Sequence, residues 1–276
     1  MSERVAIQLD TLTRLADGFR ESRGISGNLT TEQMITLAAT PIPSEPTTSK
    51  LPHIIARTAT ELTAEDLAGV TEIGDYAFYK YSTLKSVTIP NSVISMGKAA
   101  FGVCENIENT YYDGDLTLWC KISLSTKENP LPYKGNIYLK NSFGEYELLT
   151  NLVIPDGIIN IGSFYFSNNS SLINATIGNS VIKLNFNAMS GCKNLINVTI
   201  GDSVNTIDKY AFSSCPKLMS VRIGNGITSI DGSAFNLCTS LTDIYIDKPE
   251  GSVPNAPWGA TNATIHWNTP LPSEEE

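Results

Sequence analysis

The sequence contains few of the residues that build catalytic and metal sites. Its 276 residues include two histidines and five cysteines, and no cysteines form a CxxC pair. An odd cysteine count without such pairs indicates neither a disulfide framework nor a zinc site. The two histidines, His53 and His266, lie near opposite ends of the chain. We therefore expect no catalytic residues, no metal site and no cofactor, and we interpret the protein as a non-enzyme.

Basic charge and long apolar runs are also scarce. Nineteen basic residues against 28 acidic ones give a net charge of -9, which disfavours nucleic acids and anionic membrane surfaces. No run of about 18 apolar residues is present to span a bilayer, and residues 1–19 lack the features of a secretory signal. We expect no nucleic-acid partner and no membrane insertion. The expected location is virion-associated or cytoplasmic, or alternatively at the cell surface or secreted by a non-classical route.

What the sequence does contain is a repeat of 23 residues. Six similar segments start at Val70, Val93, Ile158, Val181, Val204 and Ile227, spaced by 23 except for the gap between Val93 and Ile158. A second run, LKSVTI from Leu84, recurs later in the units and has β-branched residues at alternating places, which indicates short strands. One unit cannot bury its apolar side chains alone, so the units are predicted to stack as a solenoid with a parallel sheet.

Two residue types recur in phase with this repeat. The first set is Phe78, Phe101, Phe166, Phe212 and Phe235, and the second is Cys104, Cys192, Cys215 and Cys238. Stacked units would align each set into an internal column. Because free cysteine packs as a small hydrophobe and is usually buried, we interpret the cysteine column as packing and not as chemistry.

The spacing IGxxAFxxCxxLxxVxI resembles the BspA-like leucine-rich-repeat family over roughly residues 70–247. The resemblance implies a curved solenoid, and some members of the family are bacterial surface adhesins. It implies no catalytic residues. The expected fold class is an α+β repeat: a leucine-rich-repeat solenoid with 23-residue units and a parallel sheet, preceded by a small helical hairpin.

Composition divides the chain into five expected parts. These are a helical attachment or oligomerisation segment over 1–40, a linker over 41–50, the solenoid over 51–247, a C-terminal cap over 248–270 and a disordered tail over 271–276. The first part makes the chain a candidate homo-oligomer, since helices of this length are marginal alone. In the cap, Trp258 and Trp267 are expected to cover the last coil, with a final strand over 263–267. Both terminal segments resemble those of prophage structural or tail-associated proteins.

The gap in the repeat leaves two interpretations open. Residues near 116–134 are expected to form an insertion after the second coil. Residues 135–150 form either a further coil or a β-hairpin that protrudes from the solenoid, because alternation is good and NSFGE can turn.

Outward positions of the strands are the expected binding surface. They are Ser86, Thr88, Asn174, Thr176, Asn197, Thr199, Ser220, Arg222, Asp243 and Tyr245. The residue types most common in binding hot spots give the candidate ligand-binding residues, namely Tyr111, Tyr112, Trp119, Tyr133, Arg222 and Tyr245. The first four are equally explained by packing against the solenoid. The expected partner is a protein or a cell-surface glycan.

Three functions follow from these features. The first is a non-enzymatic binding or adhesion protein that presents a repeat surface, with a prophage tail-associated role in host recognition. The alternative is a bacterial surface or secreted adhesin that binds host or matrix ligands. The third, a glycan-processing enzyme, rests only on the aromatics and carboxylates near residues 111–147, the carboxylates being Asp113, Asp115, Glu145 and Glu147.

Overall fold

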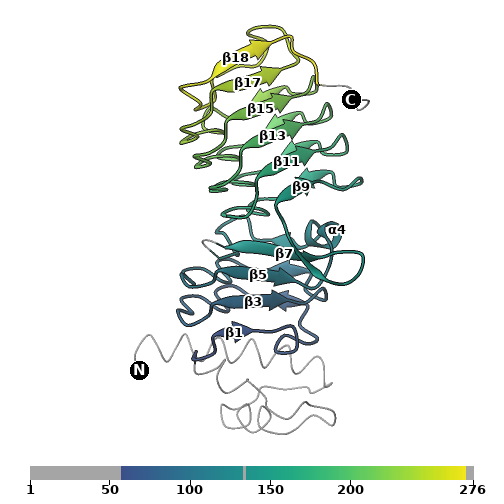
Figure 1. Cartoon of the computed structure of the whole chain (residues 1–276), viewed down its shortest axis with the longest axis vertical. Helices are drawn as coiled ribbons and strands as arrows, with labels where there is room; N and C mark the ends of the chain where they lie inside the picture. Colours follow the sequence, from purple (N-terminus) through teal and green to yellow (C-terminus); the bar gives the residue numbers. More distant parts are fainter. Residues whose placement is uncertain (1–56, 133–134, 272–276) are drawn as a thin grey trace, which may run out of the picture.

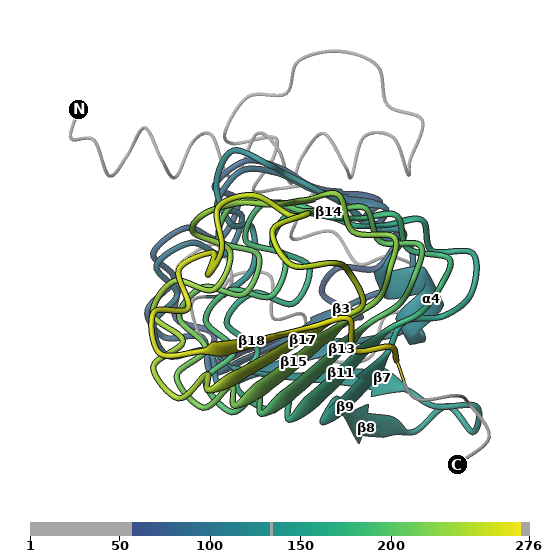
Figure 2. The same cartoon turned by 90° about the horizontal axis from the view of Figure 1, so that it is seen from above.

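The computed structural model describes residues 57–132 and 135–271. In this part the chain winds into stacked coils, and each coil adds a short strand to one of two mainly parallel sheets that follow each other along the molecule and together are called the main sheet (Figure 1). Seen along the stack, these main-sheet strands lie on one side of the coils and β14 (Thr206–Ile207) lies on the opposite side (Figure 2). The predicted solenoid with a parallel sheet is confirmed.

The main sheet is divided into two parts. The first has the order β1-β3-β5-β7-β8 and the second the order β9-β11-β13-β15-β17-β18. We call residues 57–148 the first section and residues 149–271 the second section. The first-section strands are β1 (Glu61–Leu62), β3 (Ser86–Ile89), β5 (Asn109–Tyr112), β7 (Asn136–Lys140) and β8 (Tyr146–Leu148). The second-section strands are β9 (Asn151–Val153), β11 (Asn174–Ile177), β13 (Asn197–Ile200), β15 (Ser220–Ile223), β17 (Asp243–Ile246) and β18 (Thr264–Trp267).

Two minor sheets of two-residue strands lie elsewhere on the coils. One has the order β2-β4-β6 and the other β10-β12-β14-β16. Their bounds are β2 (Glu72–Ile73), β4 (Ser95–Met96), β6 (Ser123–Leu124), β10 (Asn160–Ile161), β12 (Lys183–Leu184) and β16 (Ser229–Ile230). In most of these strands the second, apolar residue is buried, so the minor sheets also face the core.

The repeat sets the register of the second section. Asn174 of β11 lies opposite Asn197 of β13, which is 23 positions later, and β13 pairs with β15 and β15 with β17 in the same way. Adjacent strands of such a ladder are about 4.8 Å apart. The second and fourth residues of β11, β13, β15 and β17 are buried, and the others are partly or fully exposed. The period therefore aligns equivalent side chains into rows along the sheet.

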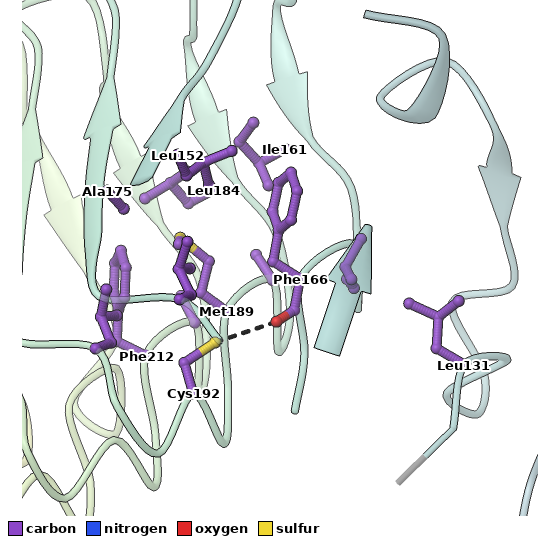
Figure 3. Packing of buried hydrophobic residues seen from close by; sticks show 14 of the residues in the cluster. Leu131, Leu152, Ile161, Phe166, Ala175, Leu184, Met189, Cys192 and Phe212 are labelled. Carbon is purple, nitrogen blue, oxygen red and sulfur yellow. Dashed lines mark hydrogen bonds between the residues drawn. The ribbon is translucent and has the colours of Figure 1, made fainter. Parts of the chain in front are cut away.

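The predicted phenylalanine and cysteine columns are present in the core. Phe78 stacks on Phe101 with ring centroids 5.0 Å apart, and Phe212 stacks on Phe235 at 5.5 Å. All five cysteines are buried and free. The thiol of Cys192 donates to the carbonyl oxygen of Phe166 at 3.1 Å (Figure 3). Cys104, Cys215 and Cys238 each repeat this bond with the carbonyl 26 positions earlier. Each thiol thus ties one coil to the preceding one, which confirms a packing role.

The described residues contain almost no helix, so the α+β part of the expected fold class is wrong. Their single helix is α4 (Leu116–Trp119). Short strands and turns account for the coils because the 23-residue unit has room for two strands and the turns that join them, with no segment long enough for a helix. The helical segment expected over 1–40 and the linker over 41–50 lie outside the described residues.

The stretch near 116–134 is not an insertion outside the repeat. It contains α4 and β6, and Ser123 of β6 pairs with Ser95 of β4 at a separation of 28 positions. The backbone N–H of Phe101 also donates to the carbonyl oxygen of Pro130 at 2.9 Å. Residues 116–132 therefore belong to the coil between β5 and β7, in which β6 follows β4 at a separation five residues longer than the period, and α4 lies within the longer part.

Residues 135–150 combine the two structures that the sequence left open. β7 continues the main sheet as a coil strand would, with Asn109 opposite Asn136. β8 then folds back antiparallel to β7 through a turn at Asn141, whose side chain accepts bonds from the N–H groups of Phe143 and Glu145. Because β8 is antiparallel, it ends the first part of the main sheet, and β9 begins the second.

The C-terminal residues cover the last coil. Trp258 is fully buried and meets Trp267 edge to face, with centroids 6.1 Å apart. β18 pairs in parallel with β17, with Asp243 opposite Thr264 at a separation of 21 positions. The strand expected over 263–267 is therefore present. Within the described ranges, no helix has the length and apolarity required to cross a bilayer.

Candidate binding surface

The expected outward positions of the main strands are confirmed. Each lies at the first or third place of its strand, and all ten are partly or fully exposed. Together with the equivalent residues of β5, β7, β9 and β18, they form one side of the main sheet. We call this side the outward face. Its composition is uneven, because aromatic and charged side chains gather at two places.

The first place is a cluster of three tyrosines in the first section. Tyr111 of β5 stacks on Tyr138 of β7 with centroids 4.7 Å apart, and Tyr146 of β8 meets Tyr111 edge to face at 5.1 Å. We call Tyr111, Tyr138 and Tyr146 the tyrosine cluster. Tyr111 and Tyr138 are half-buried, while Tyr146 is 41% exposed. The parallel pairing of β5 with β7 and the antiparallel return of β8 bring these rings together.

An ion pair adjoins the tyrosine cluster. Lys140 pairs with Asp113, and the Lys140 ammonium also lies 5.4 Å from the centre of the Tyr146 ring. The Tyr146 hydroxyl donates to Asp113 at 3.3 Å. Burial raises the pKa of Tyr146 to about 12, and the negative charge of Asp113 adds to this shift. The Tyr146 phenol is therefore held neutral beside a compensated pair of charges.

The second place is at the C-terminal end of the outward face. The Arg222 guanidinium lies 4.4 Å from the centre of the Tyr245 ring, and the other neighbour of that ring is His266, stacked at 4.4 Å with an interplanar angle of 13°. His266 Nε2 is 2.8 Å from Asp243 Oδ1. We call Arg222, Asp243, Tyr245 and His266 the arginine cluster. Its members come from β15, β17 and β18, which are adjacent strands.

Asp243 is already compensated within this cluster. The Thr242 hydroxyl donates to its carboxylate at 2.7 Å, and this bond, followed by the contact with His266, lowers the pKa of Asp243 below its usual range. No ion pair joins Arg222 to an acidic residue in the part of the chain that the structure describes. The guanidinium is thus a cation that lies over the face of an aromatic ring.

A polar row lies between the two clusters. The Asn174 amide donates to Asn151 at 2.8 Å, and the Asn197 amide donates to Asn174 at 3.1 Å. Thr176 and Thr199 form the parallel row beside them. Each amide keeps a second N–H and free lone pairs, so the row can still form hydrogen bonds with a ligand.

The structure separates the six candidate ligand-binding residues. Tyr111 lies in the tyrosine cluster, and Arg222 and Tyr245 lie in the arginine cluster. Tyr112 and Trp119 are each 1% exposed and meet edge to face at 5.3 Å, so they cannot contribute to an exposed surface. Trp119 also donates from Nε1 to the carbonyl oxygen of Tyr165 at 3.2 Å, which explains its burial. Tyr133 lies outside the described residues, as does His53.

Three residues of the clusters were not identified as binding residues from the sequence. Tyr138 and Tyr146 lie within residues 135–150, for which the sequence left a coil and a hairpin open. The alternation in NIYLK nevertheless indicates that Tyr138 faces outward, as Tyr111 does on the neighbouring strand. His266 was interpreted as an isolated residue. The last coil is shorter and brings His266 beside Tyr245. The sequence signal for this contact was the strand expected over 263–267, which pairs with β17.

Two of the four carboxylates behind the enzyme hypothesis, Asp113 and Asp115, have structural partners. Asp115 is the N-cap of α4 and accepts from the Leu118 N–H at 2.8 Å, and Asp113 pairs with Lys140. Burial raises the pKa of the Cys120 thiol to about 12 and that of Cys104 to about 11, which disfavours the reactive thiolate. Within residues 57–132 and 135–271, no three His, Cys, Asp or Glu side chains are grouped as a metal ion requires.

These features define a leucine-rich-repeat β-solenoid. They are stacked coils with a parallel main sheet, turns of about 23 residues, and a fixed pattern of buried leucine, phenylalanine and cysteine. The BspA type leucine rich repeat region matches this sequence in six copies, over residues 58–126 and 137–256. These ranges cover more than half of the chain, and the chain therefore belongs to that family.

Solved structures of bacterial repeat proteins are similar over most of the chain. A leucine rich cell surface protein from Faecalibacterium prausnitzii is 18% identical over 73% of this chain, with a TM-score of 0.39, and the match covers 63% of that protein, less than two thirds of its length. A leucine-rich repeat protein from Eubacterium ventriosum is 16% identical over 79% of this chain and 75% of its own, with a TM-score of 0.41. The pneumococcal vaccine antigen PcpA is 14% identical over 71% and 68%, with a TM-score of 0.37. No curated protein matches the sequence.

Proposed function

We propose that this chain is a non-enzymatic binding or adhesion protein of bacterial origin, and that it contacts its ligand through the outward face. The observation that carries the proposal is the concentration of aromatic and charged side chains in two clusters on one side of one sheet. Tyrosine and arginine are the residue types over-represented in binding hot spots. Repeat solenoids of this kind use their extended sheet surfaces to bind other molecules, which supports the same role.

The two clusters are held in place before any ligand arrives. Tyr111, Tyr138 and Tyr146 contact one another, and Tyr245 is held between Arg222 and His266. Binding therefore costs little side-chain entropy, which otherwise opposes association by about 0.5–1.5 kcal/mol for each flexible side chain that becomes ordered. The stacked coils beneath the clusters keep them on a rigid, extended surface.

A binding screen with matched variants tests the proposal. The labelled full chain is applied to host matrix proteins, to mucins and to bacterial cell-wall fractions, and the retained label is measured. A double variant, Tyr111→Ser with Arg222→Gln, should lose at least about tenfold in affinity for any surface that retains the wild type.

The matched control for this screen is Lys183→Ala, which changes a partly exposed residue of the minor sheet whose ion pair with Asp208 spans 2.9 Å. It should bind as the wild type does. Retention of the double variant at wild-type affinity, or failure of every surface to retain the wild type, would contradict the proposal.

Association with a prophage tail is the more specific form of this function. The sequence feature that favours it is LADGFRESRGISGNLTTEQMITLA, which resembles the N-terminal segment of prophage structural proteins. Under this proposal residues 1–40 attach the chain to a particle, and the outward face recognises the host surface. Induced lysogens should then release particles that carry the protein through a density gradient. Recovery of the protein only in the cell-envelope fraction would instead support a bacterial surface adhesin.

A further inference from the structure

The arginine cluster contains a cation without an ion-pair partner among the described residues, which the general binding role does not explain. The chain carries a net charge of -9, yet Arg222 faces outward and forms no ion pair within the described residues. The nearest acidic member of the cluster, Asp243, is bound by the Thr242 hydroxyl and His266. Arg222 is therefore available to a negatively charged ligand.

The geometry of Arg222 favours binding of a carboxylate over binding of an anion that makes only a single contact. Its guanidinium lies 4.4 Å from the centre of the Tyr245 ring, and His266 supports the opposite side of that ring. The N–H groups of a guanidinium form a planar fork that matches the two oxygens of a carboxylate. Because the contact with the Tyr245 ring restricts the Arg222 side chain, less entropy is lost on binding.

The surface beside Arg222 indicates what kind of molecule bears the carboxylate. Thr199 lies opposite Arg222 on the neighbouring strand, and the row continues through Thr176. The adjacent row contains Asn197 and Asn174, whose amides retain free hydrogen-bonding groups. Hydroxyl and amide groups repeated at the strand spacing of about 4.8 Å suit a polyhydroxyl chain, whereas protein partners bury an apolar centre that these rows lack.

We propose that the outward face of the second section binds an acidic polysaccharide, with Arg222 contacting the carboxylate of a uronic acid unit and the threonine and asparagine rows contacting neighbouring hydroxyl groups. This inference rests on the proposed binding function, and it names the ligand class and the residue that recognises its charge. Tyr245 is a positioning residue, because it holds the Arg222 guanidinium and contacts the ligand only at its rim.

The test uses two polymers that differ only in charge. Polygalacturonate and its fully methyl-esterified form, of equal chain length, are immobilised, and binding of the full chain is measured by interferometry. The wild type should bind the acid form at least about tenfold more tightly than the ester, since the ester removes the charge-assisted hydrogen bonds. Arg222→Gln should bind both polymers equally. Arg222→Lys should retain only part of the preference, because lysine lacks the fork.

Three further variants distinguish loss of binding at the arginine cluster from a general effect of charge or ring removal. Tyr245→Phe should bind as the wild type does, and Tyr245→Leu should lose affinity, since only the first keeps the stacked ring. Lys183→Gln removes one positive charge from the minor sheet and should leave binding unchanged. Each variant is used only if its melting temperature matches that of the wild type.

Several results would overturn the inference. Equal binding of both polymers by the wild type, or equal losses for Arg222→Gln and Lys183→Gln, would mean that Arg222 does not recognise the carboxylate. Stronger binding of polyglutamate than of polygalacturonate would assign the site to acidic peptides. If neither polymer binds while the chain still adheres to cells or matrix, this inference fails and the proposed function stands. If no surface of any kind retains the chain, both fail.

Discussion

The first and second sections follow the same plan with different regularity. Paired main strands of the second section are separated by 23 positions up to β17, and the last pair by 21. In the first section the separations are 25, 23 and 27. The outward residues of the regular strands β11 and β13 are asparagine and threonine. Each cluster is completed by a strand that follows an irregular coil, namely β7 after the long coil and β18 after the short one.

This comparison indicates how a repeat protein acquires a binding site. Strict repetition aligns identical side chains and produces a surface that hydrogen-bonds along its length but has few anchors. A change in coil length brings different side chains into register, as with Tyr138 beside Tyr111 and His266 beside Tyr245. We infer that the irregular coils complete the two clusters, while the regular coils supply the rows of polar side chains between them and the repeated core beneath.

The largest expected effect tests the regular core. Phe212 is fully buried and stacks on Phe235 in the second section. Phe212→Ala should lower the free energy of unfolding by about 3–5 kcal/mol, through lost burial and the remaining cavity. Chemical denaturation measures this change. Thr199→Ala on the outward face should change stability by less than about 0.5 kcal/mol. Equal effects at the two positions would mean that the assignment of inward and outward faces is wrong.

The next effect tests the connection between the sections. Trp119 Nε1 donates to the carbonyl of Tyr165, and the Tyr165 hydroxyl donates to the carbonyl of Ile122 at 2.5 Å, so these two bonds link the sections. Trp119→Phe should destabilise the protein by about 1–3 kcal/mol, because it leaves a buried carbonyl unpaired and a smaller ring in place. It should also separate one thermal transition into two. Trp258→Phe, which removes a bond to Pro254 inside the cap, should leave a single transition. A single transition in both variants would contradict the division into sections.

The third effect is a loss of stability at alkaline pH that begins near the junction. Burial raises the pKa of Tyr112 and of Tyr165 from 10.0 to about 12. Because the folded state favours the neutral phenols, their contribution is complete below pH 10 and is lost as the pH rises from 10 to 12. Tyrosinate absorbance followed together with circular dichroism should show these two groups ionising late, as the junction between the sections unfolds. Ionisation of every tyrosine near pH 10 with the fold intact would contradict this expectation.

The smallest effect compares equivalent positions of two coils. Leu237 has a φ of 61° and is 61% exposed, and the residue two coils earlier is Gly191, with a φ of 73°. A left-handed conformation costs a non-glycine residue about 1–2 kcal/mol, whereas glycine adds unfolded-state entropy of about 0.5–1 kcal/mol. Leu237→Gly should therefore stabilise the fold by up to about 1 kcal/mol. Leu237→Ala is the control and should bring no gain, and Gly191→Ala should destabilise. Calorimetry distinguishes the three variants, and a lower melting temperature for Leu237→Gly would refute the strain argument.

The sequence predicted the solenoid because its period is repeated in many residues. The 23-residue spacing placed the phenylalanines and cysteines inside and the outward residues on one face. It did not predict the coil over 116–132, because α4 and the extra residues have no counterpart in other units. The hairpin that contains β8 remained one of two possibilities for the same reason, because a strand in residues 135–150 is compatible with either a further coil or a hairpin.

The candidate surface was predicted only in part. Tyr111, Arg222 and Tyr245 follow from strand alternation, which depends on the local sequence. Tyr112 is the immediate neighbour of Tyr111, so alternation points it inward, and composition alone did not distinguish the two. The contact of His266 with Tyr245 depends on the separation of 21 positions between the last strands, and no repeat fixes that separation.

Site-specific blocking of the outward face tests the central claim most directly. The native cysteines are all buried, so a single introduced cysteine can be coupled selectively to a polyethylene glycol chain. Thr199→Cys and Thr88→Cys place the polymer beside the arginine and tyrosine clusters, and Lys183→Cys places it on the minor sheet. We expect coupling at Thr199→Cys or Thr88→Cys to abolish adhesion and coupling at Lys183→Cys to leave it unchanged. Loss of adhesion only on coupling at Lys183→Cys would contradict the assignment of binding to the outward face.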